Sequence, residues 1–130
     1  MEYIKLLRKY FKRFRDYRTR EKELSRRILF AVTDEERKRY AEEMEEISEV
    51  VQCGFKMIGE IENIKARRVV ELHYADGKNW REISMRINYS YGYCTHLEDN
   101  ALKELAGKEK IRQILAGNQN NLQFLKDSKK

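Results

Sequence analysis

The sequence predicts an all-α fold, in which an N-terminal antiparallel helical hairpin is followed by three shorter helices. Three observations support this prediction. The 130 residues include no proline, which favours uninterrupted helices and argues against sandwiches and barrels. Apolar residues recur at spacings of three, four and seven over long stretches. Residues that cap helix N-termini stand directly before several of these stretches. A chain of this length fits one domain with an appendage rather than two independent globular domains.

The first predicted helix covers residues 2–31, and its apolar side chains form a single stripe. The members of this stripe are Ile4, Leu7, Phe11, Phe14, Tyr17, Leu24, Ile28 and Ala31. Glu21 interrupts the stripe, and Lys and Arg fill the other faces. Aromatic residues at this spacing are more often core residues than ligand or membrane contacts, so Phe11, Phe14 and Tyr17 are expected to be buried.

A second helix is predicted to begin directly after Thr33, which has the spacing of a capping box with Glu36. Its apolar stripe consists of Tyr40, Met44, Ile47, Val51, Phe55, Ile58 and Ile61. Gly54 and Gly59 weaken this helix and favour a kink or a break. Because only a short link separates the two helices, residues 1–62 are predicted to form an antiparallel, coiled-coil-like hairpin for interaction or dimerisation.

Residues 63–107 are predicted to form three shorter helices. Asn63 is a suitable N-cap for the first of these, which extends through Tyr74. A turn follows at residues 76–79. The last residue of this turn has the spacing of a capping box with Glu82, which predicts the start of the second helix.

A break at residues 88–90 separates the second short helix from a longer third one at residues 91–106. The predicted inward positions of this third helix are Cys94, Leu97, Ala101, Leu102 and Leu105. Gly107 is expected to end it in the left-handed conformation. Two helices joined by a tight turn are typical of a helix-turn-helix, whose last helix presents its outer face to the major groove of DNA. Residues 108–130 are predicted to form a basic, partly flexible tail, with a short helix near residues 111–115.

The net charge of +6 is distributed in blocks. Residues 1–32 contain eleven Lys and Arg against four acids, whereas residues 33–62 contain four basic residues against ten acids. Opposite charges favour pairing of neighbouring helices, so the two blocks are expected to neutralise each other in part. A pI near 9.3 is compatible with a polyanionic partner such as nucleic acid.

Composition and missing motifs exclude several protein classes. Two cysteines, Cys53 and Cys94, form no disulfide framework and favour the cytoplasm. The first residues lack the apolar core of a secretory signal, and the longest apolar run, residues 28–32, is too short to span a bilayer. Cys94 is expected to face inward and His96 outward, which excludes a shared zinc site. Without a catalytic constellation or a glycine-rich phosphate loop, the sequence predicts neither an enzyme nor a cofactor.

Several segments within residues 63–107 resemble region 4 of bacterial sigma factors. These segments are Val69–Tyr74, Gly77, Trp80–Ser84, Tyr89–Ser90 and Ala101–Leu105. The chain is similar still more closely to small phage-encoded regulators of the RinA and ArpU type, which pair an N-terminal helical segment with a sigma-like helix-turn-helix. The resemblance implies a phage or prophage transcription regulator that binds double-stranded DNA in the host cytoplasm and contacts RNA polymerase.

The resemblance and the nearby basic residues together define the candidate DNA-binding residues. The residues that the resemblance turns toward the groove are Tyr91, Gly92, Thr95 and His96, with Asp99 and Asn100 one turn later. Basic residues around them are expected to contact phosphates, with a solvated surface charge as the alternative for each. These basic residues are Arg67, Arg68, Lys78, Arg81 and Arg86.

The outer face of the last helix departs from the sigma pattern. It has no Arg or Lys before Lys103, and it carries Glu98 and Asp99, which repel phosphate. An acidic face of this kind suits a basic groove on a protein. The alternative function is therefore a phage-encoded inhibitor, similar to an anti-CRISPR protein, that binds host RNA polymerase or a CRISPR nuclease through the same scaffold.

Two other kinds of partner are a membrane and a second copy of the chain. Membrane binding by the basic first helix is disfavoured, because residues 33–62 compete for its apolar stripe. The oligomeric state is open, and the hairpin offers a surface for a homodimer.

Overall fold

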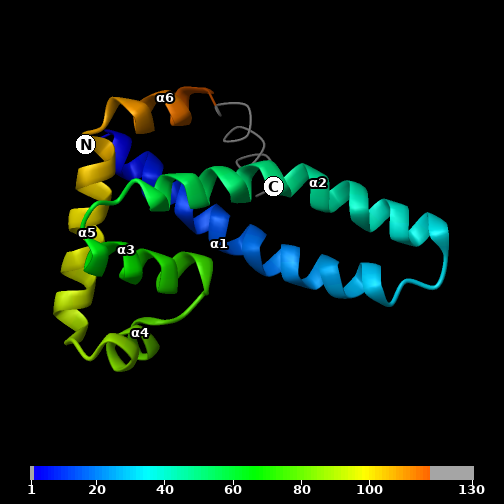
Figure 1. Ribbon diagram of the computed structural model, residues 1–130, viewed down its shortest axis with the longest axis horizontal. Coiled ribbons are helices and arrows are strands. Elements are labelled where there is room, and N and C mark those ends of the chain that lie inside the picture. Colours follow the sequence, from blue (N-terminus) through cyan, green and yellow to red (C-terminus); the bar gives the residue numbers. More distant parts are fainter. Residues whose placement is uncertain (1, 118–130) are drawn as a thin grey trace.

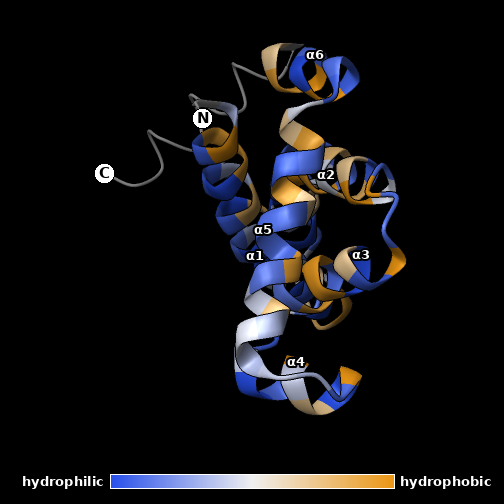
Figure 2. Cartoon of the chain, turned by 90° about the vertical axis from the view of Figure 1, so that its left-hand side faces the viewer, coloured by the Kyte–Doolittle hydropathy of each residue, from blue (hydrophilic) through white to orange (hydrophobic). Residues whose placement is uncertain are grey.

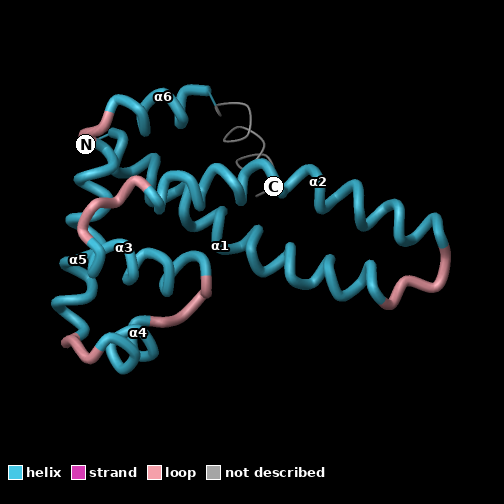
Figure 3. The backbone as a smooth tube through the Cα atoms, in the orientation of Figure 1, coloured by secondary structure: helices cyan, strands magenta, loops and turns pink. Residues whose placement is uncertain are grey.

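The structure is a computed structural model that describes residues 2–117. These residues form six α-helices and one π-helical turn, and no strand occurs among them (Figure 1; Figure 3). The prediction of an all-α protein is therefore confirmed. The predicted tail beyond residue 117 lies outside the described residues.

The two longest helices, α1 (Glu2–Leu29) and α2 (Asp34–Gly59), pack against each other and are joined by a short loop at one end of the molecule (Figure 1). The Thr33 hydroxyl accepts a hydrogen bond of 3.1 Å from the backbone N–H of Glu36, as the capping pattern predicts. Helix α1 ends two residues earlier than predicted. Half of the apolar stripe predicted for it is buried, including Phe11 and Phe14, whereas Tyr17 is only half-buried.

Gly54 does not break α2, because the glycine serves a close approach between the two long helices. A Cβ atom at residue 54 would lie 2.2 Å from the ring of Phe14, which is completely buried. Only a residue without a side chain leaves room for that ring. Helix α2 continues through Gly54 and ends at Gly59, so a break occurs at the second of the two glycines that predicted it.

The third helix, α3 (Ile64–Val70), begins at Asn63, whose side chain accepts a hydrogen bond of 3.0 Å from the N–H of Ala66. The helix then widens into the π-helical turn η1 (Glu71–Ala75). In this wider turn both Leu72 and Tyr74 are buried. The predicted helix through Tyr74 is therefore present, with a local change of winding.

Three helices complete the described chain: α4 (Trp80–Ile87), α5 (Tyr91–Ala106) and α6 (Glu109–Gly117). The prediction for Gly107 is wrong, since this residue is right-handed at φ −81°. Its N–H bonds the carbonyls of Lys103 and Glu104, and the chain enters α6 without a left-handed residue. Helix α5 packs against both α1 and α3, which lie on either side of it in Figure 2.

One hydrophobic core joins α1 and α2 to the shorter helices. Phe11 of α1 stacks on Tyr74 of η1 with ring centroids 5.3 Å apart. Tyr10 is also completely buried, and its hydroxyl donates a hydrogen bond of 2.6 Å to the carbonyl of Val50. The predicted stripe omits Tyr10. Helix α1 is covered by η1 and α5 as well as by α2, so its buried arc is wider than the stripe.

Candidate nucleic-acid interface

Local hydrogen bonds fix the two helices α4 and α5 and the turn between them. Asn79 and Glu82 form the predicted capping box, with distances of 2.9 and 3.2 Å. Helix α4 ends at Asn88, which is left-handed at φ 59° and ψ 41°. Asparagine adopts this conformation more readily than other side-chain-bearing residues. Two residues later, the Ser90 hydroxyl accepts a hydrogen bond from the N–H of Tyr93 and begins α5.

The inner face of α5 agrees with the prediction. All five predicted inward residues are buried, namely Cys94, Leu97, Ala101, Leu102 and Leu105. Burial raises the pKa of the Cys94 thiol, which keeps it protonated. His96 lies on the opposite face and is exposed. A shared zinc site would require the two side chains to lie together, and they do not.

The outer face of α5 presents polar and aromatic side chains to solvent. Tyr91 is 57% exposed at the start of the helix. His96 and Asn100 are exposed one turn apart, with 3.1 Å between Nε2 of the imidazole and the amide nitrogen. Thr95 is half-buried, and its hydroxyl donates to the carbonyl of Gly92 at 2.9 Å. Imidazole and amide groups at these positions have the hydrogen-bonding capacity needed to contact base edges.

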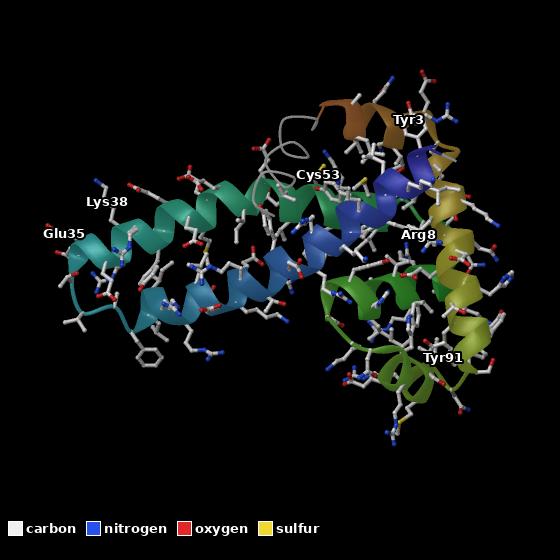
Figure 4. The ribbon with its side chains drawn as sticks, turned by 180° about the vertical axis from the view of Figure 1, so that it is seen from behind. Tyr3, Arg8, Glu35, Lys38, Cys53 and Tyr91 are labelled. Atoms are coloured by element: carbon white, nitrogen blue, oxygen red, sulfur yellow. The ribbon has the colours of Figure 1, made fainter. Side chains whose placement is uncertain are left out.

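Glu98 and Asp99 of α5 are not free on this face, which corrects the prediction for Glu98. Glu98 is 4% exposed, and its Oε1 lies 2.6 Å from Nδ1 of His73 in η1. Asp99 is half-buried and accepts a hydrogen bond from Arg8 of α1, which raises the pKa of that guanidinium. Figure 4 shows Arg8 between α1 and α5. Both acids are therefore held by partners within the molecule.

The predicted phosphate contacts fall into two groups. Arg81 and Arg86 are exposed on α4, and neither forms an ion pair with any described residue. Lys78 precedes α4 and lies 3.9 Å from Glu82. In contrast, Arg67 and Arg68 lie on α3, which packs against the buried side of α5. The structure thus places Arg81 and Arg86 on α4, the helix that leads into α5, and Arg67 and Arg68 on α3.

The predicted site does not include a cationic groove that lies between α1 and the shorter helices. Its volume is about 540 Å³, and it is lined by Lys5, Arg8, Lys9, Lys12, His73, Tyr74, Trp80 and Glu98. Trp80 contacts His73 and also Tyr91, with ring centroids 4.3 and 6.0 Å apart. The groove therefore extends from α1 to η1, to the start of α4 and to Glu98 of α5. The sequence shows the lysines at helical spacing, but only the tertiary structure places the chain segments opposite them.

The expected neutralisation between the two charge blocks is limited. Within the described part of the chain, α1 and α2 share a single ion pair, in which Arg20 binds Glu43 at 2.8 and 2.9 Å. The other acids that pair with arginines of α1 lie on α1 itself or on α5. Much of the basic surface of α1 therefore remains available.

Residues 2–117 also bear on two further classes of feature, metal sites and membrane-spanning helices. No group of three or more His, Cys, Asp and Glu side chains in this part of the chain is arranged to hold a metal ion. None of its helices is both long and apolar enough to cross a membrane.

Comparison with protein-family models, curated proteins and solved structures gives no match to this chain.

Proposed function

We propose that this chain is a DNA-binding transcription regulator of phage or prophage origin, in which α4, the turn at Asn88 and α5 form a helix-turn-helix. The observation that supports it most is the outer face of α5. Tyr91, His96 and Asn100 are exposed there. Of the two acids that would repel DNA, Glu98 is paired with His73 and Asp99 with Arg8. In a helix-turn-helix this face enters the major groove.

The basic residues of α4 suit the role of phosphate contacts. Arg81 lies in the first turn of α4 and Arg86 in its last turn, and both guanidinium groups are exposed without an acidic partner among the described residues. The first helix of a helix-turn-helix crosses the DNA backbone, where such groups meet phosphates. Arginine suits this role because its planar fork of donors matches phosphate oxygens.

The experiment is duplex binding followed by fluorescence anisotropy over a series of salt concentrations. Each phosphate contact contributes roughly 0.9 to the slope of log affinity against log salt, so Arg81→Gln with Arg86→Gln is expected to lower the slope by about 1.8. The matched control is Lys22→Gln with Arg26→Gln, which removes the same charge from exposed positions far along α1. Absence of duplex binding by the unaltered chain at low salt contradicts the proposal.

Base contacts are tested separately from phosphate contacts. His96→Ala with Asn100→Ala is expected to reduce the preference for a selected site by roughly 1–3 kcal/mol per lost base contact. Affinity for unrelated duplex should change little, because these side chains are uncharged or weakly charged. Equal losses on both duplexes would show that α5 does not recognise sequence.

An inhibitor of a host protein is the second candidate, and one observation favours it. Leu29, Phe30 and Val32 at the loop between α1 and α2 are 76%, 73% and 89% exposed. An apolar group of this kind is common at protein contacts. Of the two acids that suggest an inhibitor, Glu98 is buried, and Asp99 is half-buried and paired with Arg8. A chain that binds no duplex, yet retains a stoichiometric host protein after nuclease treatment, favours this function.

A further inference from the structure

We propose that the lysine stripe of α1, formed by Lys5, Lys9 and Lys12, is a second DNA-contacting surface that binds the phosphate backbone beside the groove occupied by α5. This inference rests on the proposed function, because it requires the outer face of α5 to bind duplex DNA. It assigns to α1 a role in binding DNA in addition to its role in packing.

The three lysines form one stripe on the side of α1 that faces away from the core. Their spacing of four and three residues places successive Cα atoms roughly 6 and 4.5 Å apart along the helix axis. Lys5 and Lys12 are exposed and Lys9 is half-buried, and all three line the cationic groove. Flexible ammonium groups at this spacing can follow a run of phosphates.

These lysines lack acidic partners within the part of the chain that the structure describes. None of them belongs to an ion pair there, whereas Arg8, which lies beside them, is occupied by Asp99. Asp16, one turn beyond Lys12 on the same stripe, is exposed and likewise forms no ion pair with the described residues. Like charges three and four residues apart destabilise an isolated helix. A bound polyanion would relieve this repulsion.

Contacts within the molecule connect the stripe to the proposed recognition surface. Arg8 of α1 binds Asp99 of α5, one turn beyond the exposed His96. At the other end of the groove, Trp80 touches Tyr91 at the first residue of α5. Figure 4 shows this side of the molecule, with α1 in front and α5 along its right-hand edge.

The dimensions of DNA explain why a helix beside α5 meets the backbone. Packed helices lie about 8–10 Å apart, and the major groove is about 12 Å wide. With α5 centred in the groove, the axis of an adjacent helix falls beyond the edge of the groove, over the phosphates. Helix α1 packs against α5, so in the proposed complex its outward lysines would lie toward that strand.

The test measures salt-dependent binding of the full chain to a mixed-sequence duplex long enough to cover both surfaces. Lys9→Gln with Lys12→Gln is expected to lower the salt slope by about 1.8 and to weaken binding at moderate salt by roughly tenfold or more. Lys9→Arg with Lys12→Arg should keep the slope, because the charge is retained. Lys22→Gln with Arg26→Gln is the matched control on the same helix, about 15 Å further along it and beyond the screening length.

The outcomes separate this inference from the function on which it rests. A lower slope for the Lys9 and Lys12 variant, with an unchanged slope for the control, supports it. If Arg81→Gln with Arg86→Gln lowers the slope but the lysine variant matches the control, the inference is overturned while the proposed function stands. If the unaltered chain binds no duplex, both are overturned. Circular dichroism of each variant establishes that the fold is retained.

Discussion

Glu98 and Asp99 are neighbours in the sequence, but a rotation of about 100° around α5 gives them different surroundings. Glu98 turns toward η1, where it is buried against His73. Asp99 turns toward α1 and keeps about half of its side chain in solvent while it binds Arg8. A buried polar group that loses its partner is costly, whereas an exposed ion pair contributes little. The two acids should therefore differ in their effect on stability.

Matched substitutions test this difference. Glu98→Ala is expected to lower the free energy of unfolding by about 1–3 kcal/mol, because it leaves the His73 ring without its partner in a buried site. Asp99→Ala should lower it by less than about 1 kcal/mol. Urea denaturation followed by circular dichroism measures both. Equal losses would mean that Glu98 is a surface acid, as the sequence pattern alone predicts.

At the scale of elements, Gly54 determines how closely α1 and α2 approach. Alanine is favoured over glycine inside a helix by about 1 kcal/mol. A Gly→Ala substitution with free space around the new Cβ atom should therefore stabilise the protein. At residue 54 a Cβ atom meets the buried Phe14 ring, whereas at residue 59 nothing lies within 4 Å of it. Gly54→Ala is therefore expected to destabilise the protein by about 1–3 kcal/mol through overpacking.

Gly59→Ala is the control for this prediction and should leave stability unchanged or raise it slightly. Thermal unfolding of the two variants and the unaltered chain provides the comparison. Stabilisation by both substitutions would show that the two helices do not approach closely at Gly54.

The element boundaries were largely predictable because short-range patterns set them. Thr33, Asn63, Asn79 and Ser90 cap helices at the expected positions. The errors arise where a distant segment decides the outcome. Glycine at residue 54 suggests a break until Phe14 is placed opposite it. The orientation of Glu98 likewise depends on His73, which is 25 residues away in the sequence.

The candidate site was predictable to a smaller extent. Exposure of His96 and Asn100 follows from the periodicity of α5, so its outer face could be predicted from the sequence. The position of Lys9 and Lys12 beside Trp80 could not, because helical spacing gives a face and not the neighbour of that face. The charge blocks suggested α2 as the partner of this surface, whereas the groove lies between α1 and the shorter helices.

At the scale of the whole molecule, α1 contributes both to the hydrophobic core and to the charged surface. Its buried side supplies Leu7 and Phe11 to the core that also contains Tyr74 and Leu102 of the shorter helices. Its opposite side carries the lysine stripe. Because α1 is packed against η1 and α5, the stripe is fixed in orientation relative to the proposed recognition helix. A rigid arrangement of this kind lowers the entropic cost of binding two surfaces together.

The shared core predicts that residues 63–130 do not fold without α1. Only a short chain would remain, and the side of Tyr74 that stacks on Phe11 would be exposed to water. The isolated fragment is expected to show weak helical circular dichroism and no cooperative thermal transition, whereas the full chain should unfold in a single transition. In the full chain, Phe11→Ala is expected to cost about 3–5 kcal/mol and to lower the protection of α5 against hydrogen exchange together with that of α2. A fragment that melts cooperatively and binds duplex as tightly as the full chain would instead make the shorter helices an independent domain. The lysines of α1 would then have no fixed place beside the DNA.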